Sequence, residues 1–163
     1  MPLCLCVNGQ EHALQLEPGT LLIDALRDGL QLTGTHQGCD TAQCGACTVL
    51  ADGAAVKSCN VLALQMQGRE IQTIESVSLA QPSPVSPQLH ALQQAFSRHH
   101  ALQCGYCTPG FVMRALAMRT EGVPADPQAV REALAGNLCR CTGYAGIVAA
   151  ICEWLAVENE SAS

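Results

Sequence analysis

Hydrophobic residues follow two different patterns along this chain of 163 residues, with strand-like runs in the first half and helical spacing in the second. Two dipeptides in the first half, Asn8-Gly9 and Asp52-Gly53, each separate a pair of short apolar runs. Such dipeptides favour the tight turn of a β-hairpin. The paired runs are 3–7 with 12–16, and 48–51 with 54–56. We therefore predict two hairpins in the first half.

The predicted N-terminal domain also contains one helix, one loop and one further strand. Apolar residues at 21, 22, 25 and 26 recur at helical spacing after Thr20, a candidate N-cap, and Asp28-Gly29 ends the segment. The stretch from Thr33 to Cys47 shows neither the alternation of a strand nor the spacing of a helix, which is typical of an ordered loop or a ligand-binding loop. Ile71–Ile74 is the predicted last strand.

The second half is predicted to be helical and to follow a linker. Residues 78–87 contain three prolines and three serines, which is typical of an extended linker. Apolar residues then recur at helical spacing at 89–96, 111–118, 130–134 and 147–154. Thr108-Pro109 and Asp126-Pro127 each place a candidate cap before a proline at a helix start. We predict an α+β protein with a domain at 1–77, a bundle of about four helices at 88–158 and a tail at 159–163.

Charge and hydropathy exclude nucleic acid and the membrane interior as partners. The net charge is −6 with only eight Lys and Arg residues, so no basic surface is expected that would bind nucleic acid. No uncharged apolar stretch reaches the roughly 18 residues of a membrane span, and the N-terminus lacks the pattern of a signal peptide. We therefore expect a cytoplasmic protein with no transmembrane segment.

Eleven cysteines are the most informative part of the composition. In a reducing compartment structural disulfides are rare, and an odd count fits a full disulfide framework poorly. Metal ligation is therefore the leading interpretation. The alternative is a disulfide framework in a protein exported by another route.

A first set of four cysteines has the spacing CxxxxCxxC, with the fourth member twelve positions further on. The set is Cys39, Cys44, Cys47 and Cys59. This is the spacing of plant-type ferredoxins, in which a tight loop supplies three thiolates to a 2Fe-2S cluster. Gly38 and Gly45 give such a loop the necessary backbone freedom. Zinc is the alternative, although zinc sites rarely use a four-residue spacer.

A second set consists of two close pairs separated by a long segment. The set is Cys104, Cys107, Cys139 and Cys141. By spacing alone it is compatible with zinc, a redox dithiol or an iron-sulfur cluster. Predicted helix starts at Thr108-Pro109 and Thr142-Gly143 favour the cluster, because helix N-termini stabilise negative charge.

The remaining cysteines and a pair of histidines receive ordinary structural interpretations. Cys4, Cys6 and Cys152 are predicted to be small core residues. The adjacent His99 and His100 lack the neighbouring cysteines of a Rieske site and are predicted to form an exposed helix end.

Four motifs, taken together and in this order, resemble the small iron-sulfur subunit of the molybdenum hydroxylases, the xanthine oxidase family. They are GCDTAQCGACTVL at 38–50, Lys57-Ser58-Cys59, LQCGYCTPGFVM at 102–113 and GNLCRCTGY at 136–144. The resemblance implies a β-grasp ferredoxin-like domain followed by a four-helix bundle domain, each with one 2Fe-2S cluster. Ala42 departs from the glycine that many members have in the first loop, which we interpret as a minor backbone adjustment.

The resemblance also implies a direction of electron flow. A separate large subunit would carry the molybdopterin cofactor, often as the cytosine dinucleotide. The helical-domain cluster would lie nearest the pterin, with Cys141 approaching the ring and the Gln103 side chain hydrogen-bonded to it. The plant-type cluster would pass electrons to FAD on a medium subunit, or to a cytochrome. Without the motif, Gln103 would be read as a solvated side chain at a helix end, and Arg140 is expected either to favour the reduced cluster or to pair with a carboxylate.

These observations predict the electron-transfer subunit of a multi-subunit molybdenum hydroxylase or dehydrogenase, with no substrate site of its own. Because the sequence ends near residue 163 without FAD or molybdenum regions, a separate subunit is expected. Two alternatives are a free-standing ferredoxin-like electron carrier and a zinc-stapled adaptor without redox function. The few charges of the helical half favour a permanent interface over a transient one.

Overall fold

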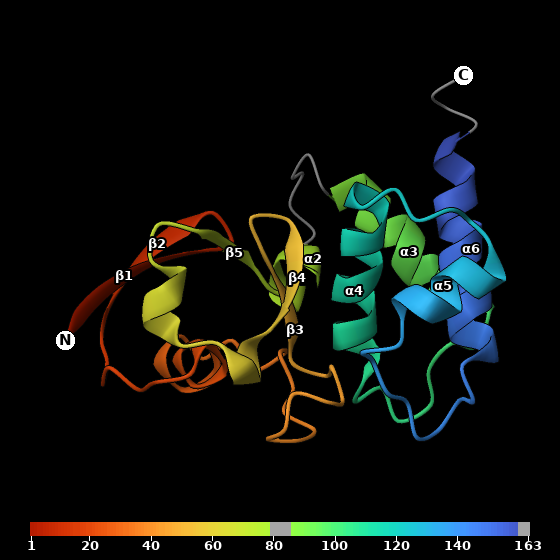
Figure 1. Cartoon of the computed structure of the whole chain (residues 1–163). Coiled ribbons are helices and arrows are strands. Elements are labelled where there is room, and N and C mark those ends of the chain that lie inside the picture. The colour runs from red at the N-terminus through yellow and green to blue at the C-terminus, as the bar shows by residue number, and fades with distance from the viewer. Residues whose placement is uncertain (79–85, 160–163) are drawn as a thin grey trace.

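The fold combines a five-stranded sheet with a group of helices that stands beside it (Figure 1). The computed structural model describes residues 1–78 and 86–159. Among these residues, no helix has the length and apolar character needed to cross a bilayer.

The elements follow the predicted order of strands first and helices second. The strands are β1 Pro2–Val7, β2 Gln10–Gln15, β3 Thr48–Ala51, β4 Ala54–Lys57 and β5 Glu70–Gln72. The α-helices are α1 Leu22–Asp24, α2 Ile74–Ser78, α3 Ser86–Arg98, α4 Thr108–Thr120, α5 Pro127–Ala133 and α6 Ala145–Asn159. Three short helical turns complete the description, the π-helical η1 Ala25–Gly29 and the 3-10 turns η2 Ser58–Asn60 and η3 Ala63–Met66.

Both predicted hairpins are confirmed. At each turn the two central residues adopt positive φ, 54° and 76° at Asn8-Gly9 and 50° and 81° at Asp52-Gly53, as the favoured two-residue turn requires. The strand order is β2-β1-β5-β3-β4, with β1 and β5 parallel and the other neighbouring pairs antiparallel. The sheet is therefore mixed.

Strand β3 is buried along its whole length because it separates two hydrophobic cores. Side chains alternate between the faces of a strand. Val49 and Ala51 pack with the core of the sheet half, whereas Leu50 packs with the core of the helical half. Strand β3 thus joins the two halves of the molecule directly, and it follows the first cysteine loop without a break.

The helical half is built around a core contributed by all four long helical segments. Phe96 of α3, Phe111 of α4, Val130 of α5 and Ile147 of α6 are all buried in it. The predicted cap of α5 is confirmed, because the Asp126 carboxylate accepts hydrogen bonds from two backbone N–H groups of the first turn.

Three local predictions were wrong. Ile74 begins helix α2 instead of ending a strand, Thr20 lies before the N-cap residue Leu21 and caps nothing, and the N-cap of α4 is Cys107 instead of Thr108. Most of the predicted linker at 78–87 lies outside the described residues, as does the tail after Asn159. Of the linker residues that the structure describes, Ser78 is the last residue of α2, and residues 86 and 87 are the first two of α3.

The structure also corrects two of the core predictions. Cys4 is exposed and Cys6 is partly exposed, because the larger side chains of Leu3, Leu5 and Val7 take the buried face of β1. Alternation along a strand leaves the other face to the cysteines. Cys152, in contrast, does pack against the helical core.

The histidine prediction was right for only one of the pair. His100 is exposed, but His99 is half-buried, and its ring pairs with the Glu153 carboxylate of α6. Arg98 contacts the same carboxylate. The end of α3 is therefore tied to α6.

Candidate metal centres

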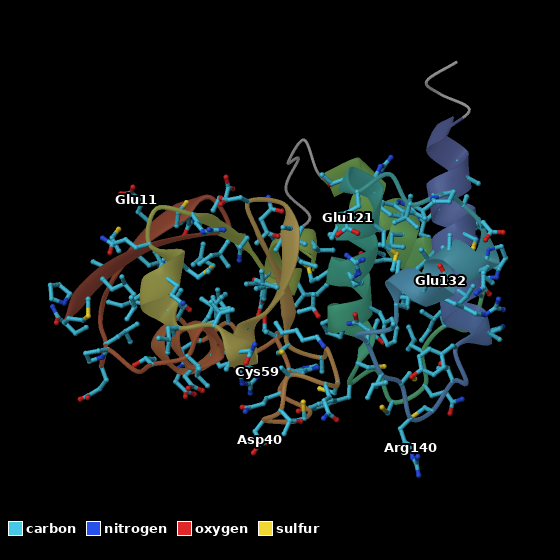
Figure 2. The ribbon with its side chains drawn as sticks, viewed as in Figure 1. Glu11, Asp40, Cys59, Glu121, Glu132 and Arg140 are labelled. Atoms are coloured by element: carbon cyan, nitrogen blue, oxygen red, sulfur yellow. The ribbon has the colours of Figure 1, made fainter. Side chains whose placement is uncertain are left out.

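Both predicted cysteine sets lie in loops at the same end of the molecule. In Figure 2, Asp40 and Arg140 point outward from this end, one from each loop region. Asp40 directly follows the first cysteine of the first set, and Arg140 lies between two cysteines of the second. The fold therefore brings the two sets, far apart in sequence, close together in space.

The first set forms two sulfur pairs. Cys39 and Cys44 interact through their side chains, and the backbone N–H of Cys44 also donates to the Cys39 sulfur over 3.4 Å. Cys47, at the start of β3, and Cys59, in the turn after β4, are buried and interact with each other. The loop thus supplies three sulfurs and the turn a fourth, as the spacing predicted.

The two pairs of the first set differ in how readily their thiols ionise. Hydrogen bonds from the backbone N–H groups of Cys44 and Thr41 lower the pKa of Cys39 to about 6. Burial, followed by the nearby Cys47 thiol, raises the pKa of Cys59 to about 11. A thiol of that kind is protonated at neutral pH, so Cys59 becomes a ligand only when a bound metal displaces its proton.

The second set also forms two sulfur pairs, each joining the two distant segments. The sulfurs of Cys104 and Cys141 are 3.7 Å apart, and Cys107 interacts with Cys139. A redox dithiol would instead pair the two cysteines of the CGYC segment. The observed pairing speaks against that alternative.

Hydrogen bonds concentrate on one sulfur of the second set. Burial opposes ionisation of Cys139, but donors from the side chain and backbone of Thr142 and from the backbone of Cys141 outweigh it and lower its pKa. Burial raises the pKa of Cys107 to about 12. In this set, too, one thiol ionises more readily than an ordinary cysteine and another needs a bound metal to ionise.

The eight sulfurs thus lie in four pairs, two in each set. This arrangement suits one two-iron cluster in each set. Cys₄ ligation of a 2Fe-2S cluster gives each iron two protein thiolates. Within the described residues, no three His, Cys, Asp or Glu side chains converge as the ligands of a single metal ion. The backbone N–H groups directed at sulfur are the interactions that tune such clusters.

Lys57 holds the first loop in an unusual conformation. Its Nζ donates to the carbonyl oxygens of Ala42, over 2.6 Å, and Gln43. Ala42 has φ of 56°, a region that costs an ordinary residue roughly 1–2 kcal/mol. Ala42 thus adopts a backbone conformation that glycine adopts more readily.

Two hydrogen bonds join the two loops, and helix α4 packs closely against the first loop. The N–H of Leu138 donates to the carbonyl of Cys44 over 2.8 Å, and the buried Asn137 amide donates to the carbonyl of Gly45 over 3.0 Å. Gly110 of α4 also lies against Gly45, where a side chain would not fit. Sequence reasoning missed these roles, although Asn137 and Leu138 belong to the quoted motif GNLCRCTGY.

The surface around the second set is open and partly apolar. Cys104 and Cys141 are exposed, and so are the neighbouring Leu102 and Leu138. Gln103 lies on the same surface, where its amide donates to the carbonyl of Cys141 over 3.0 Å. Gln103 is thereby anchored beside Cys141, in contrast to a freely solvated side chain.

Comparisons with known proteins agree with this geometry. A family model described as a 2Fe-2S iron-sulfur cluster binding domain matches residues 5–76, and one described as a 2Fe-2S binding domain matches residues 73–152. The beta subunit of the 6-hydroxypseudooxynicotine dehydrogenase complex of Paenarthrobacter nicotinovorans is 50% identical over 145 residues, covering 88% of this chain and 87% of that protein. The gamma subunit of caffeine dehydrogenase of Pseudomonas sp. (strain CBB1) is 47% identical over 150 residues, covering 90% and 86%. This chain belongs to the small iron-sulfur subunits of the molybdenum hydroxylases.

Solved structures of the family share the fold of this iron-sulfur subunit. A chain of quinoline 2-oxidoreductase from Pseudomonas putida 86 matches with a TM-score of 0.88 and 42% identity, covering 99% of this chain and 96% of that one. Aldehyde oxidoreductase from Desulfovibrio gigas matches with a TM-score of 0.86 and 37% identity, and here this subunit corresponds to only 17% of the longer chain. The protein is therefore an electron-transfer subunit of a multi-subunit oxidoreductase instead of a free ferredoxin.

Proposed function

We propose that this subunit binds one 2Fe-2S cluster in each cysteine set and relays electrons from a molybdopterin centre in a large partner subunit to an external acceptor. The first cluster would take Cys39, Cys44, Cys47 and Cys59, and the second Cys104, Cys107, Cys139 and Cys141. When bound, each cluster supplies one-electron redox chemistry. The observation that carries the proposal is the grouping of all eight sulfurs into four pairs.

The difference in exposure between the two sets supports an order along the relay. Cys104 and Cys141 are exposed, whereas Cys47 and Cys59 are buried. A cluster held at an open, partly apolar surface is suited to a permanent partner, whose docking covers that surface. We therefore assign the second cluster to the side of the large subunit.

Gln103 is the residue that we assign to the pterin. An amide both donates and accepts hydrogen bonds, which suits the edge of a heterocycle. The bond from Nε2 to the Cys141 carbonyl fixes the side chain beside the second set and leaves its oxygen available as an acceptor. The cofactor would be the cytosine dinucleotide form, and the final acceptor FAD on a medium subunit or a cytochrome.

The remaining features of the proposal concern the fold and the location. We assign the sheet half, 1–77, to the β-grasp type and the helical half, 88–158, to a four-helix bundle domain. The mixed sheet and the shared core of α3 to α6 support this assignment. We place the complex in the cytoplasm, where a reducing environment keeps the thiols available for iron.

Selective removal of one ligand tests the proposal. In Cys104→Ser we expect the EPR signal of the second cluster to be lost or strongly altered, while the plant-type signal remains. Cys152→Ser is the matched control, because this cysteine packs against the helical core and belongs to neither set, and it should retain both signals. Retention of two unchanged signals in Cys104→Ser would overturn the ligand assignment.

A further inference from the structure

A stacked pair of aromatic side chains connects the loops of the two cysteine sets. The rings of His36 and Tyr106 have centroids 4.5 Å apart and an interplanar angle of 15°. His36 precedes Cys39 by three residues, and Tyr106 directly precedes Cys107. The contact therefore spans from the entrance of the first loop to the middle of the CGYC segment.

Two hydrogen bonds reinforce the stack. Nδ1 of His36 lies 2.8 Å from the carbonyl oxygen of Tyr106, and because a carbonyl only accepts, Nδ1 carries the proton. In return, the Tyr106 hydroxyl donates to the carbonyl of Gln37 over 2.9 Å. Each residue thus binds the backbone of the opposite loop as well as the opposite ring. The ring pair is fixed in distance and in orientation.

This contact is separate from the one that Leu138 makes with Cys44. The Leu138 bond holds the segment that carries Cys139, whereas Tyr106 belongs to the segment that carries Cys107. Helix α4, which begins directly after Cys107, already lies against the first loop through Gly110 and Gly45, and the ring pair adds a contact on the other side of Cys107. The two contacts together fix both cysteine-bearing segments of the second set against the first loop.

We propose that His36 and Tyr106 are positioning residues that set the distance and orientation between the two clusters, and thereby the rate at which electrons pass between them. The inference rests on the proposed function, since it requires both cysteine sets to hold clusters. Electron transfer between fixed centres depends steeply on their separation, so a small displacement of the CGYC segment would slow it. The same displacement would carry Cys104 and Cys107 along with the second cluster, so each cluster would keep its four ligands.

The test uses the complete enzyme complex and two EPR measurements. The first is the magnetic splitting between the two reduced clusters, which falls with the cube of their separation. The second is the delay between the appearance of the two cluster signals in freeze-quenched samples after reduction. In His36→Ala we expect a changed splitting and a longer delay at unchanged iron content. His36→Phe keeps a ring over Tyr106, so it should recover part of both values.

Two further variants complete the design. Tyr106→Phe removes only the hydroxyl bond to Gln37 and keeps the stack, so a smaller change in the same direction is expected, and this variant serves if His36→Ala loses iron. His12→Ala, on strand β2 of the sheet half, is the control and should match the unmodified complex. Splitting and delay that stay unchanged in both His36→Ala and Tyr106→Phe would overturn the inference. An unmodified complex without two cluster signals would instead overturn the proposed function itself.

Discussion

The backbone N–H of Leu138 donates to the carbonyl oxygen of Cys44 over 2.8 Å. Leu138 directly precedes Cys139, so a single hydrogen bond and a short run of covalent bonds connect a proposed ligand of the first cluster with one of the second. The neighbouring Asn137 adds a second bond to the same loop. The two proposed cluster sites are therefore joined directly through this short segment.

Removing the Asn137 amide should destabilise the junction. Asn137 is buried and donates to the Gly45 carbonyl, so Asn137→Ala should lower the free energy of unfolding by about 1–3 kcal/mol. Urea denaturation of the iron-loaded complex measures this quantity. Asn60→Ala, at an exposed amide, is the control and should change stability by less than about 0.5 kcal/mol. Equal effects of the two substitutions would contradict the assigned role of Asn137.

Gly45 is expected to be more sensitive than another glycine of similar backbone conformation. Both Gly45 and Gly53 have positive φ, so alanine at either position costs about 1–2 kcal/mol. A methyl group on Gly45 would in addition lie 2.4 Å from the carbonyl oxygen of Gly136, whereas one on Gly53 meets nothing within 4 Å. Gly45→Ala should therefore reduce the yield of iron-loaded complex, and Gly53→Ala should not. A normal iron content in Gly45→Ala would show that the loops tolerate separation.

A glycine at position 42 should stabilise the first loop. Because Ala42 has φ of 56°, Ala42→Gly relieves strain and should raise the free energy of unfolding by up to about 1 kcal/mol. The exposed Ala91 lies within helix α3, so Ala91→Gly should lower it by about 0.5–1 kcal/mol. Thermal unfolding of the two variants side by side gives the sign of each effect. A loss of stability in Ala42→Gly would refute the strain at this position.

Gln103→Ala tests the assignment of this residue to the pterin. Both clusters should form, while electron transfer from the molybdenum centre to the second cluster becomes slower. Rapid-freeze EPR after addition of substrate follows this step. Gln43→Ala is the matched control, since Gln43 precedes Cys44 as Gln103 precedes Cys104. Cluster reduction at the unmodified rate in Gln103→Ala would argue against a pterin contact.

The ion pair between Arg114 and Glu121 predicts a pH dependence of stability. Two hydrogen bonds from the Arg114 guanidinium lower the pKa of the Glu121 carboxyl below its ordinary value of 4.5. The unfolded state then binds the proton more readily, so the contribution is complete above pH 4.5 and is lost as the pH falls through the lower folded-state pKa. Since Glu121 is exposed, the effect should stay within about 1 kcal/mol.

Glu121→Gln checks this dependence. The variant should be less stable than the unmodified subunit at neutral pH and equally stable in acid, as measured by urea denaturation over a pH series. Glu132→Gln is the control, because the Glu132 carboxylate accepts from the neutral Gln128 amide. A difference between Glu121→Gln and the unmodified subunit that persists at low pH would rule out the ion pair as its cause.

Local signals in the sequence predicted the hairpins and the four long helical segments, because turn dipeptides and periodicity act over a few residues. The turn at Asn8-Gly9 and the cap at Asp126 are examples. The buried face of β1 was assigned wrongly to Cys4 and Cys6, although the competing Leu5 is larger and more apolar.

Contacts between distant segments were beyond the reach of such signals. The bond from Leu138 to Cys44 depends on how α4 packs against β3, and the stack of His36 on Tyr106 depends on the same packing. Spacing alone predicted the members of both cysteine sets. Spacing did not predict which sulfurs pair. For the second set, the pairing is the observation that distinguishes a cluster site from a redox dithiol.

Iron and acid-labile sulfide analysis, combined with EPR of the dithionite-reduced complex, tests the central claim most directly. Two Cys₄-ligated 2Fe-2S clusters require about four irons and four sulfides per subunit and two distinct signals. We expect this result, together with molybdenum in the same preparation. Zinc in place of iron, with no EPR signal, would contradict the account and leave a metal-stapled adaptor.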